Sequence, residues 1–309
     1  MRKRLLFIAL FFYWTMFYAQ QESNFSHYMY NHQVINPGYV GAREVANFSS
    51  VIRSQWIGIE GAPLTQTLSF NGGLSPKKIG YGLTVMNDKI GPMSSTSFDM
   101  DLSYHLTINS KMHRLAVGLK VGFLSQFLNT SILQTTSPSD LAFATDRERD
   151  LLPNVGFGAY FYTKNFYFGF AIPRLIENKK FGLERHYYLM TGGVYDLSDN
   201  FMIKPSLLLR QVNSVSAYDL TILGIYNNRF SIGGQIRNYF SSEVFNSFSG
   251  TRFSGLLGIC LNDRFTIGYA YGLPSNKINS GFSSSSHEVF LRLDLFQKVQ
   301  GFLRSPRFF

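Results

Sequence analysis

Apolar residues alternate with small or polar residues along most of this chain, from residue 48 to residue 296. Stretches of about ten residues place an apolar or aromatic side chain at every second position. In Phe265–Tyr271 one face is large and apolar, whereas the other consists of Thr, Gly and Ala. Leu115–Phe123 follows the same pattern. Because successive side chains of a strand point to opposite faces, this alternation predicts β-strands with one strongly apolar face.

The chemistry of the two faces indicates which solvent each one meets. A soluble sheet buries its apolar face in a filled core. Here the apolar face is rich in Phe and Tyr, and the other face is mostly Gly, Ala, Ser and Thr with scattered charges. Lipid outside and a hydrated lumen inside require that arrangement. The pattern therefore predicts an all-β fold, a transmembrane β-barrel of the outer membrane, and in the strand at 264–271 it directs Phe265, Ile267, Tyr269 and Tyr271 toward lipid.

The alternating segments number about 14, and an even number of antiparallel strands is typical of single-chain outer-membrane barrels. Asn- and Asp-centred turns alternate with longer links from Asn154 onward, as expected if short turns face the periplasm and long loops face outward. The expected strands are Phe48–Ile57, Leu64–Asn71, Lys78–Asn87, Thr96–Leu106, Met112–Leu124, Asn154–Tyr162, Phe166–Ile172, His186–Tyr195, Phe201–Gln211, Tyr218–Tyr226, Arg229–Asn238, Arg252–Leu261, Arg264–Tyr271 and His287–Phe296.

Residues 1–19 have the features of a secretory signal peptide. Arg2, Lys3 and Arg4 form a basic start, Leu5–Phe17 is apolar, and Ala19 fits a cleavage position. The alternative, an uncleaved anchor helix, requires a longer apolar run than this one. Cleavage near Ala19 would leave a protein that is integral to the outer membrane.

Residues 20–47 lack the alternation of a strand. Asn36-Pro37-Gly38 is typical of a turn, and the segment also carries several large anchors, Phe25, Tyr28, Tyr30, Ile35 and Tyr39. A segment with so many aromatic residues is expected to bury them. We therefore expect a plug-like segment that packs in the lumen or at its periplasmic mouth, followed by a barrel of residues 48–309. The alternative is an exposed periplasmic arm that orders on a partner.

Composition is compatible with this interpretation. Aromatic residues make up 16% of the chain and charged residues only 16%, which suits a lipid-facing wall with aromatic girdles. A secreted β-sandwich would also have short alternating strands and remains the soluble alternative. The formal net charge of +10 indicates either a basic lumen or basic residues that face lipid head groups and solvent. No nucleic-acid partner is expected, because no reader motif is present and the signal peptide directs export.

No catalytic, cofactor or metal site is predicted, and we expect no enzymatic activity. The single cysteine, Cys260, excludes an intramolecular disulfide and a Cys-based zinc cluster. His287 and Glu288 follow a Ser-rich stretch, but in a strand they point to opposite faces and cannot act on one substrate. His105, His113 and His186 lie far apart, without the spacing of metal ligands.

A series of motifs carries a family resemblance. In order, they are Asn36-Pro37-Gly38-Tyr39-Val40-Gly41, Arg53-Ser54-Gln55-Trp56-Ile57-Gly58, Gly61-Ala62-Pro63-Leu64-Thr65, Asn87-Asp88-Lys89-Ile90-Gly91-Pro92, His186-Tyr187, Lys204-Pro205-Ser206, Ser286-His287-Glu288 and the final Ser305-Pro306-Arg307-Phe308-Phe309. This set resembles the PorP/SprF family of type IX secretion system membrane proteins over nearly all of the mature chain. Gly38 in place of Ala, and Gly272 in place of Asp, depart from the usual pattern.

The resemblance implies an outer-membrane barrel that binds, helps to export or anchors a secreted surface protein. Its implied partners are cargo with a C-terminal sorting domain, other type IX secretion components and outer-membrane lipid; some relatives accompany adhesins used in gliding motility. The alternative from the bare barrel pattern is a channel or transporter for small or hydrophobic solutes. Candidate partner or lumen contacts are Asn36, Pro37, Tyr39, Arg53, Gln55, Trp56 and Pro63.

Overall fold

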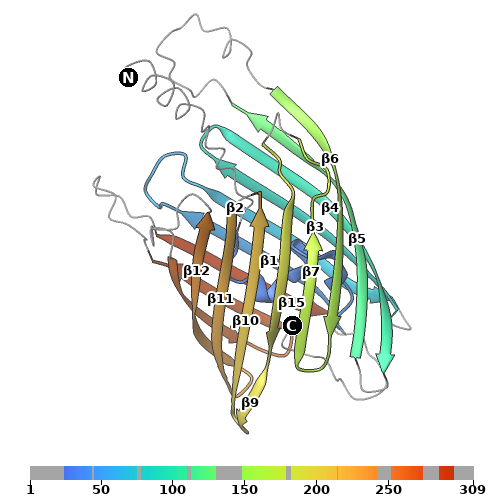
Figure 1. The fold of residues 1–309 in the computed structure, drawn as a ribbon. Helices are drawn as coiled ribbons and strands as arrows, with labels where there is room; N and C mark the ends of the chain where they lie inside the picture. The colour runs from blue at the N-terminus through green and yellow to red at the C-terminus, as the bar shows by residue number, and fades with distance from the viewer. Residues whose placement is uncertain are drawn as a thin grey trace, which may run out of the picture.

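The computed structural model describes residues 24–43, 45–74, 78–109, 113–129, 148–178, 182–213, 215–241, 252–273 and 285–295. These residues form one antiparallel sheet that closes on itself as a barrel of 14 strands (Figure 1). Within the described residues, no helix is long and apolar enough to cross a membrane. The predicted fold class, an all-β outer-membrane barrel of about 14 antiparallel strands, is confirmed.

The strands follow one another around the barrel in chain order. Their bounds are β1 Ala46–Gln55, β2 Leu64–Leu74, β3 Ile79–Ile90, β4 Met93–Asn109, β5 His113–Leu128, β6 Glu148–Tyr162, β7 Phe166–Ile172, β8 His186–Gly193, β9 Tyr195–Ser198, β10 Phe201–Val212, β11 Val215–Tyr226, β12 Phe230–Ser241, β13 Arg252–Cys260, β14 Phe265–Gly272 and β15 Ser286–Leu295. Strands β8 and β9 both pair with the same edge of β10, so together they count as one of the 14 strands of the wall. The pairing of β15 with β1 closes the barrel.

The two ends of the barrel differ in their connections. At one end, which we call the turn end, six links of at most four residues join β2–β3, β4–β5, β6–β7, β9–β10, β11–β12 and β13–β14. The other end, the loop end, carries all the longer links, including those after β5, β7, β12 and β14. Outer-membrane barrels keep short turns on the periplasmic side, so the turn end faces the periplasm and the loop end faces outward.

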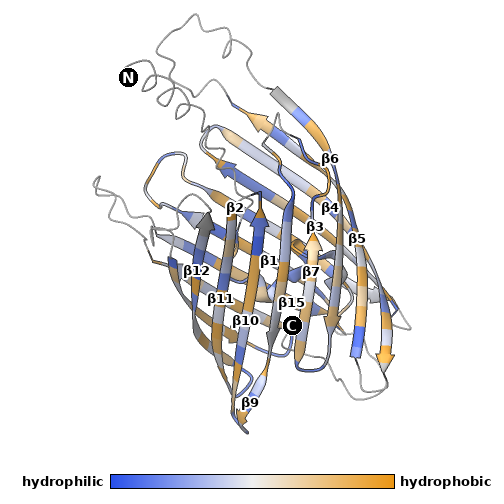
Figure 2. Ribbon diagram, viewed as in Figure 1, coloured by the Kyte–Doolittle hydropathy of each residue, from blue (hydrophilic) through white to orange (hydrophobic). Residues whose placement is uncertain are grey.

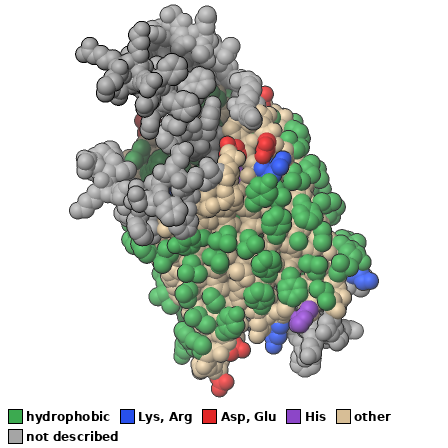
Figure 3. Space-filling model, viewed as in Figure 1, with side chains coloured by type: hydrophobic (Ala, Val, Ile, Leu, Met, Phe, Trp, Pro, Cys, Tyr) green, Lys and Arg blue, Asp and Glu red, His purple; other side chains and the backbone are tan. Residues whose placement is uncertain are grey.

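The outer surface of the barrel is apolar, as a lipid-facing wall must be. Hydrophobic and hydrophilic positions alternate along the strands (Figure 2). Hydrophobic side chains cover the face seen in Figure 3, and the charged side chains on that face lie toward its two ends. On β5, Val117, Leu119 and Val121 are exposed, whereas the intervening Gly118 and Lys120 face inward and are buried. In β14, Gly268 and Ala270 are likewise buried while Tyr269 is exposed.

Several strands extend beyond their predicted bounds. The strand predicted at 154–162 begins six residues earlier, so that Pro153 lies within β6 opposite Phe123. Strand β4 has 17 residues, although about ten residues span a bilayer in a tilted strand. The loop ends of β4–β6 therefore continue past those of β10–β12 (Figure 1). In these extensions, apolar and polar residues no longer alternate clearly. The strand predicted at 186–195 is interrupted at Val194, and β9 begins after it.

The strict alternation of short and long links was also only partly correct. After β10 the chain reverses through two residues at the loop end, where the pattern predicts a longer loop. Asn213 takes a positive φ of 47° in this turn, a conformation that Asn tolerates better than most residues.

Candidate functional site: the filled lumen and its rim

Residues 24–43, which we call the plug, run through the lumen from the loop end to the turn end. Three short 3-10 helices, η1 Tyr28–Tyr30, η2 His32–Val34 and η3 Pro37–Tyr39, make up its middle. At the start, Asn24 is hydrogen-bonded to Arg210 near the loop end of β10. At the finish, Arg43 binds Asp294 at the turn end of β15 with a shortest N–O distance of 3.0 Å. Most plug side chains between these contacts are buried.

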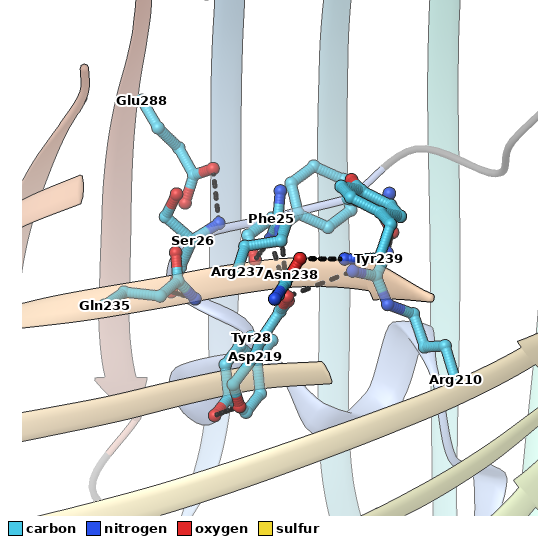
Figure 4. A network of polar contacts seen from close by, with 11 residues as sticks. Phe25, Ser26, Tyr28, Arg210, Asp219, Gln235, Arg237, Asn238, Tyr239 and Glu288 are labelled. Carbon is cyan, nitrogen blue, oxygen red and sulfur yellow. Dashed lines mark hydrogen bonds and ion pairs between the residues drawn. The ribbon is translucent and has the colours of Figure 1, made fainter. Parts of the chain in front are cut away.

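A buried carboxylate holds the beginning of the plug. Glu288 of β15 is 1% exposed and accepts hydrogen bonds from the backbone N–H groups of Ser26 and His27, both at 2.7 Å. The Nδ1 atom of His27 lies 2.8 Å from the same carboxylate. Figure 4 shows Glu288 reaching toward Ser26. Hydrogen bonds to an ionised acceptor are stronger than neutral ones, so Glu288 fixes this stretch of backbone against the wall.

A second carboxylate organises the neighbouring wall. Asp219 of β11 is fully buried and binds Arg210 at 3.0 Å and Arg237 at 2.7 Å (Figure 4). Arg237 also donates to the backbone oxygen of Phe25 at 3.1 Å, so the ion-paired cluster touches the plug directly. The hydroxyl of Tyr28 donates to the backbone oxygen of Asp219 at 3.2 Å. The plug is therefore part of the polar network of the wall.

The middle of the plug is fixed by Asn36. Its side-chain oxygen accepts from Gly38 N–H at 2.8 Å and caps η3, in which Pro37 occupies the first turn. An Asn cap followed by Pro is a favourable start for a helical turn. The side-chain amide of Asn36 donates to the backbone oxygens of Ala159 at 3.0 Å and Phe170 at 3.3 Å. One fully buried side chain thus both shapes the turn and attaches it to β6 and β7.

Glycines of the wall allow this close approach. A Cβ atom on Gly118 would lie 2.3 Å from the carbonyl carbon of Pro37. A Cβ atom on Gly158 would lie 2.1 Å from the side-chain oxygen of Asn36. Both distances are too short for any side chain, so the plug rests on bare wall backbone. These two glycines therefore have a structural role beyond keeping the lumenal face of their strands small.

The end of the plug is attached near the turn end. The backbone oxygen of Val40 accepts from the Ser103 hydroxyl at 2.6 Å and lies 2.8 Å from Nε2 of His105. The other ring nitrogen of His105 lies 2.9 Å from the Tyr162 hydroxyl. His105 is therefore a structural residue that links the plug to two strands.

The lumen carries much of the excess positive charge of the chain. Among the described residues, eight Lys and Arg side chains are buried but only four Asp and Glu side chains. Arg53 is one of them: it lies opposite Glu288 in the β1–β15 register, and its Nε and Nη1 atoms have no hydrogen-bond partner within the described part of the chain. A basic lumen thus accounts for part of the net charge, alongside basic residues at the surface.

The structure separates the predicted site residues into two groups. Asn36, Pro37 and Tyr39 are buried in the plug. Arg53 is buried in the wall, near the start of the plug. The rest lie at the loop end, where Gln55 ends β1 and Trp56 and Pro63 belong to the link between β1 and β2. Gln55 N–H donates to the Pro63 oxygen at 3.0 Å, and Trp56 N–H donates to the Ser285 oxygen at 3.0 Å. These last three residues lie at the rim.

The rim combines residues of three sequence motifs, which begin at Arg53, Gly61 and Asn87. Gly91 N–H, in the turn between β3 and β4, donates to the oxygen of Gly61 in the link between β1 and β2 at 2.8 Å. Trp56 has a positive φ of 53° and is 37% exposed, and the next residue, Ile57, is 56% exposed. A positive φ is uncommon for a residue other than Gly, so the backbone at Trp56 holds this indole in an unusual conformation. We call residues 56–63 with 90–92 the rim surface.

Sequence reasoning missed the residues that anchor the plug. Glu288 stands in one of the family motifs and beside His287, but the sequence predicts no contact between it and the plug, and it does not single out Asp219 or Arg237. One feature of the sequence could have found them. Each is a charged residue at a strand position that faces the lumen, where Gly, Ser or Thr is usual, and a buried charge there must meet another polar group. His287 and Glu288 do point to opposite faces, and His287 lies outside the lumen 2.7 Å from the Tyr269 hydroxyl. No cluster of three or more His, Cys, Asp or Glu that could hold a metal occurs within the described ranges.

A closed wall with an apolar belt and a polar lumen defines a transmembrane β-barrel of the outer membrane. The chain matches the family described as "Type IX secretion system membrane protein PorP/SprF" over residues 17–293. It therefore belongs to the PorP/SprF family, as its motifs predict, and that family is not a known class of enzyme.

Solved structures of other proteins are similar to this chain at low sequence identity. The Ralstonia pickettii toluene transporter TbuX is 10% identical, with a TM-score of 0.51, over 84% of this chain and 92% of that one. The Acinetobacter baumannii outer membrane protein Omp33 is 9% identical, with a TM-score of 0.46, over 82% and 100%. No curated protein matches the sequence. At such identities, the similarity to TbuX shows the fold alone.

Proposed function

We propose that this barrel is a non-enzymatic partner-binding component of the type IX secretion system, which binds, helps to export or anchors a secreted surface protein. The observation that carries this proposal is the rim surface. Two motifs that are distant in sequence, the one that begins at Gly61 and the one that contains Gly91, are joined there by a backbone hydrogen bond of 2.8 Å between Gly91 and Gly61. The rim surface lies at the outward-facing end, where a secreted protein would be met.

The state of the lumen supports a binding role. The plug occupies the lumen and is attached at its start by Glu288, in its middle by Asn36 and at its end by Ser103. Moving it would break charge-assisted hydrogen bonds at a desolvated site, which is costly. A barrel filled in this way acts through its surfaces. Its proposed partners are a cargo protein with a C-terminal sorting domain and other secretion components, with lipid around the wall.

The export route is part of the same proposal. Residues 1–19 act as a signal peptide that is removed near Ala19, and the mature protein is integral to the outer membrane. Both an SprF-like role beside a surface adhesin and a PorP-like role within the secretion machine fit this arrangement.

Co-purification tests the proposal. Tagged protein extracted gently from outer membranes is expected to recover a large surface protein or a secretion component. Trp56→Ala, at the rim surface, should reduce that recovery, whereas Tyr195→Ala, at the exposed turn end, should leave it unchanged. Recovery of neither class of protein by the wild type contradicts the proposal. Equal recovery by both variants contradicts the choice of the rim surface.

The second candidate function is solute transport. Its support is the shared fold with TbuX, a structure described as a toluene transporter. A steady, solute-selective conductance of the purified protein in planar bilayers would favour transport over partner binding.

A further inference from the structure

A pocket of about 310 Å³ opens at the turn end, between the plug and the wall formed by β10–β15. Two exposed turns, Asn227–Arg229 and Leu261–Asp263, frame its mouth. Deeper in the pocket lie Tyr30 of the plug and two buried cations, Lys204 and Arg292. Because the turn end faces the periplasm, this pocket is open to periplasmic ligands.

The cations of the pocket outnumber its available acids. Asp294 lines the pocket but already accepts from Nη2 of Arg43 at 3.0 and 3.2 Å. It lies 3.6 Å from Nε of Arg292. Lys204 donates to the backbone oxygen of Met29 at 3.3 Å, a neutral acceptor. Arg43, Lys204 and Arg292 are thus buried near the half-buried carboxylate of Asp294, and the other acid that lines the pocket, Asp263, lies in an exposed turn.

Arg292 has unused hydrogen-bonding capacity. It is 4% exposed, and its Nε and Nη1 atoms have no hydrogen-bond partner within the described residues. Its Nη2 atom reaches the Thr266 hydroxyl only at 3.5 Å. A buried guanidinium with so few acceptors is costly, and the planar group is suited to a carboxylate that accepts two parallel hydrogen bonds.

We propose that this pocket binds a carboxylate presented by a segment of a periplasmic protein. The carboxylate accepts from Arg292 and is attracted by Lys204, while Ile225, Ile259 and Phe230 supply apolar surface for the stem of an Asp or Glu side chain. The volume is at the lower limit of ligand pockets and suits one or two side chains. The choice of a protein as the source of the carboxylate rests on the proposed function, whereas the anion site itself does not.

The only cysteine of the chain provides a reporter. Cys260 lines the pocket, is half-buried, and its sulfur lies 3.6 Å from the Thr266 hydroxyl. In the purified full-length barrel, a blocked pentapeptide with one Glu should slow the reaction of Cys260 with a neutral maleimide roughly fivefold or more near saturation. The same peptide with Gln should have no effect. Protection by both peptides, or by neither, would overturn the proposal.

Variants identify the group responsible. Arg292→Gln should abolish protection by the Glu peptide, whereas Arg252→Gln, which removes the same charge at the loop end of β13, should retain it. Retained protection in Arg292→Gln would refute the assignment. If Arg292→Gln fails to assemble, the wild type still decides: an anionic methanethiosulfonate should modify Cys260 roughly tenfold faster than a cationic one, relative to a free thiol. Equal relative rates would overturn the anion site.

Inorganic phosphate at matched ionic strength distinguishes the source of the anion. Phosphate that protects as well as the Glu peptide would overturn the choice of a protein carboxylate. These outcomes are independent of co-purification, since a barrel that recovers no secretion partner can still bind the Glu peptide, and the reverse also holds.

Discussion

Replacement of Glu288 by Gln tests how the plug is held. The substitution keeps the size of the side chain but removes its charge and one of its two acceptor oxygens. In the native structure, both oxygens are used: one accepts from Ser26 N–H, and the other from His27 N–H, each at 2.7 Å. The Gln amide would direct an N–H group at a buried N–H group of the plug.

The cost follows from these contacts. A hydrogen bond to a charged group contributes about 1.5–3 kcal/mol, and an unsatisfied buried donor costs about 1–3 kcal/mol. Loss of one such bond, together with the weakening of the others, should destabilise docking of the plug by roughly 2–4 kcal/mol. Since each 1.4 kcal/mol is a factor of ten, the population with an undocked plug should rise about 30-fold to 1,000-fold.

Native-state proteolysis measures that population. Chymotrypsin can cut after Tyr28 or Tyr30 only when the plug leaves the lumen, because Tyr28 is 1% exposed. The cutting rate should rise in Glu288→Gln while the barrel band persists on gels. Glu60→Gln, the same change at an exposed rim residue, is the matched control. Equal cutting rates for wild type and Glu288→Gln would refute the role of Glu288, and rapid trimming of the wild type would refute a docked plug.

Three further substitutions test the wall. Ile267→Arg on the lipid face should impair assembly more than Thr266→Arg on the lumen face, because a midplane charge costs about 2–4 kcal/mol there; equal yields in membranes would refute the orientation. Gly118→Val should undock the plug without preventing insertion, since a Cβ there would meet plug backbone at 2.3 Å; unchanged proteolysis would contradict this. Asp219→Asn leaves two buried arginines without their carboxylate and should lower the stability of the barrel by about 3–5 kcal/mol. The barrel should then lose its folded mobility on gels at a lower temperature, whereas Asp196→Asn, at an exposed position, should not change that temperature.

The wall could be predicted from the sequence because its physical cause is local. Lipid contact requires an apolar residue at every second position, and that alternation is visible without any knowledge of neighbours. The orientation of Tyr269 and Ala270 followed from the same rule. Strand ends were less predictable, because the extensions of β4–β6 beyond the membrane no longer need an apolar face. The strand was predicted to begin at Asn154, yet β6 begins at Glu148 and contains Pro153.

The plug was predictable only in outline. Its aromatic residues indicate burial, but the partners of Asn36 lie more than 120 residues away, and no local pattern identifies them. The lumenal charges pose the same difficulty. The alternation places Asp219 and Glu288 on the lumenal face of their strands, so each needs a polar partner. Whether that partner is water, another strand or the plug depends on how the barrel closes. The rim surface likewise exists only once β1–β4 bring its three motifs together.

Planar-bilayer recording of the purified wild-type protein tests the central claim, a filled barrel that acts by binding partners, most directly. The account predicts no steady conductance from the wild type. It predicts transient openings in Glu288→Gln, more frequent than in the wild type to the same degree that proteolysis of the plug is faster. A steady, solute-selective current through the wild-type barrel would contradict it.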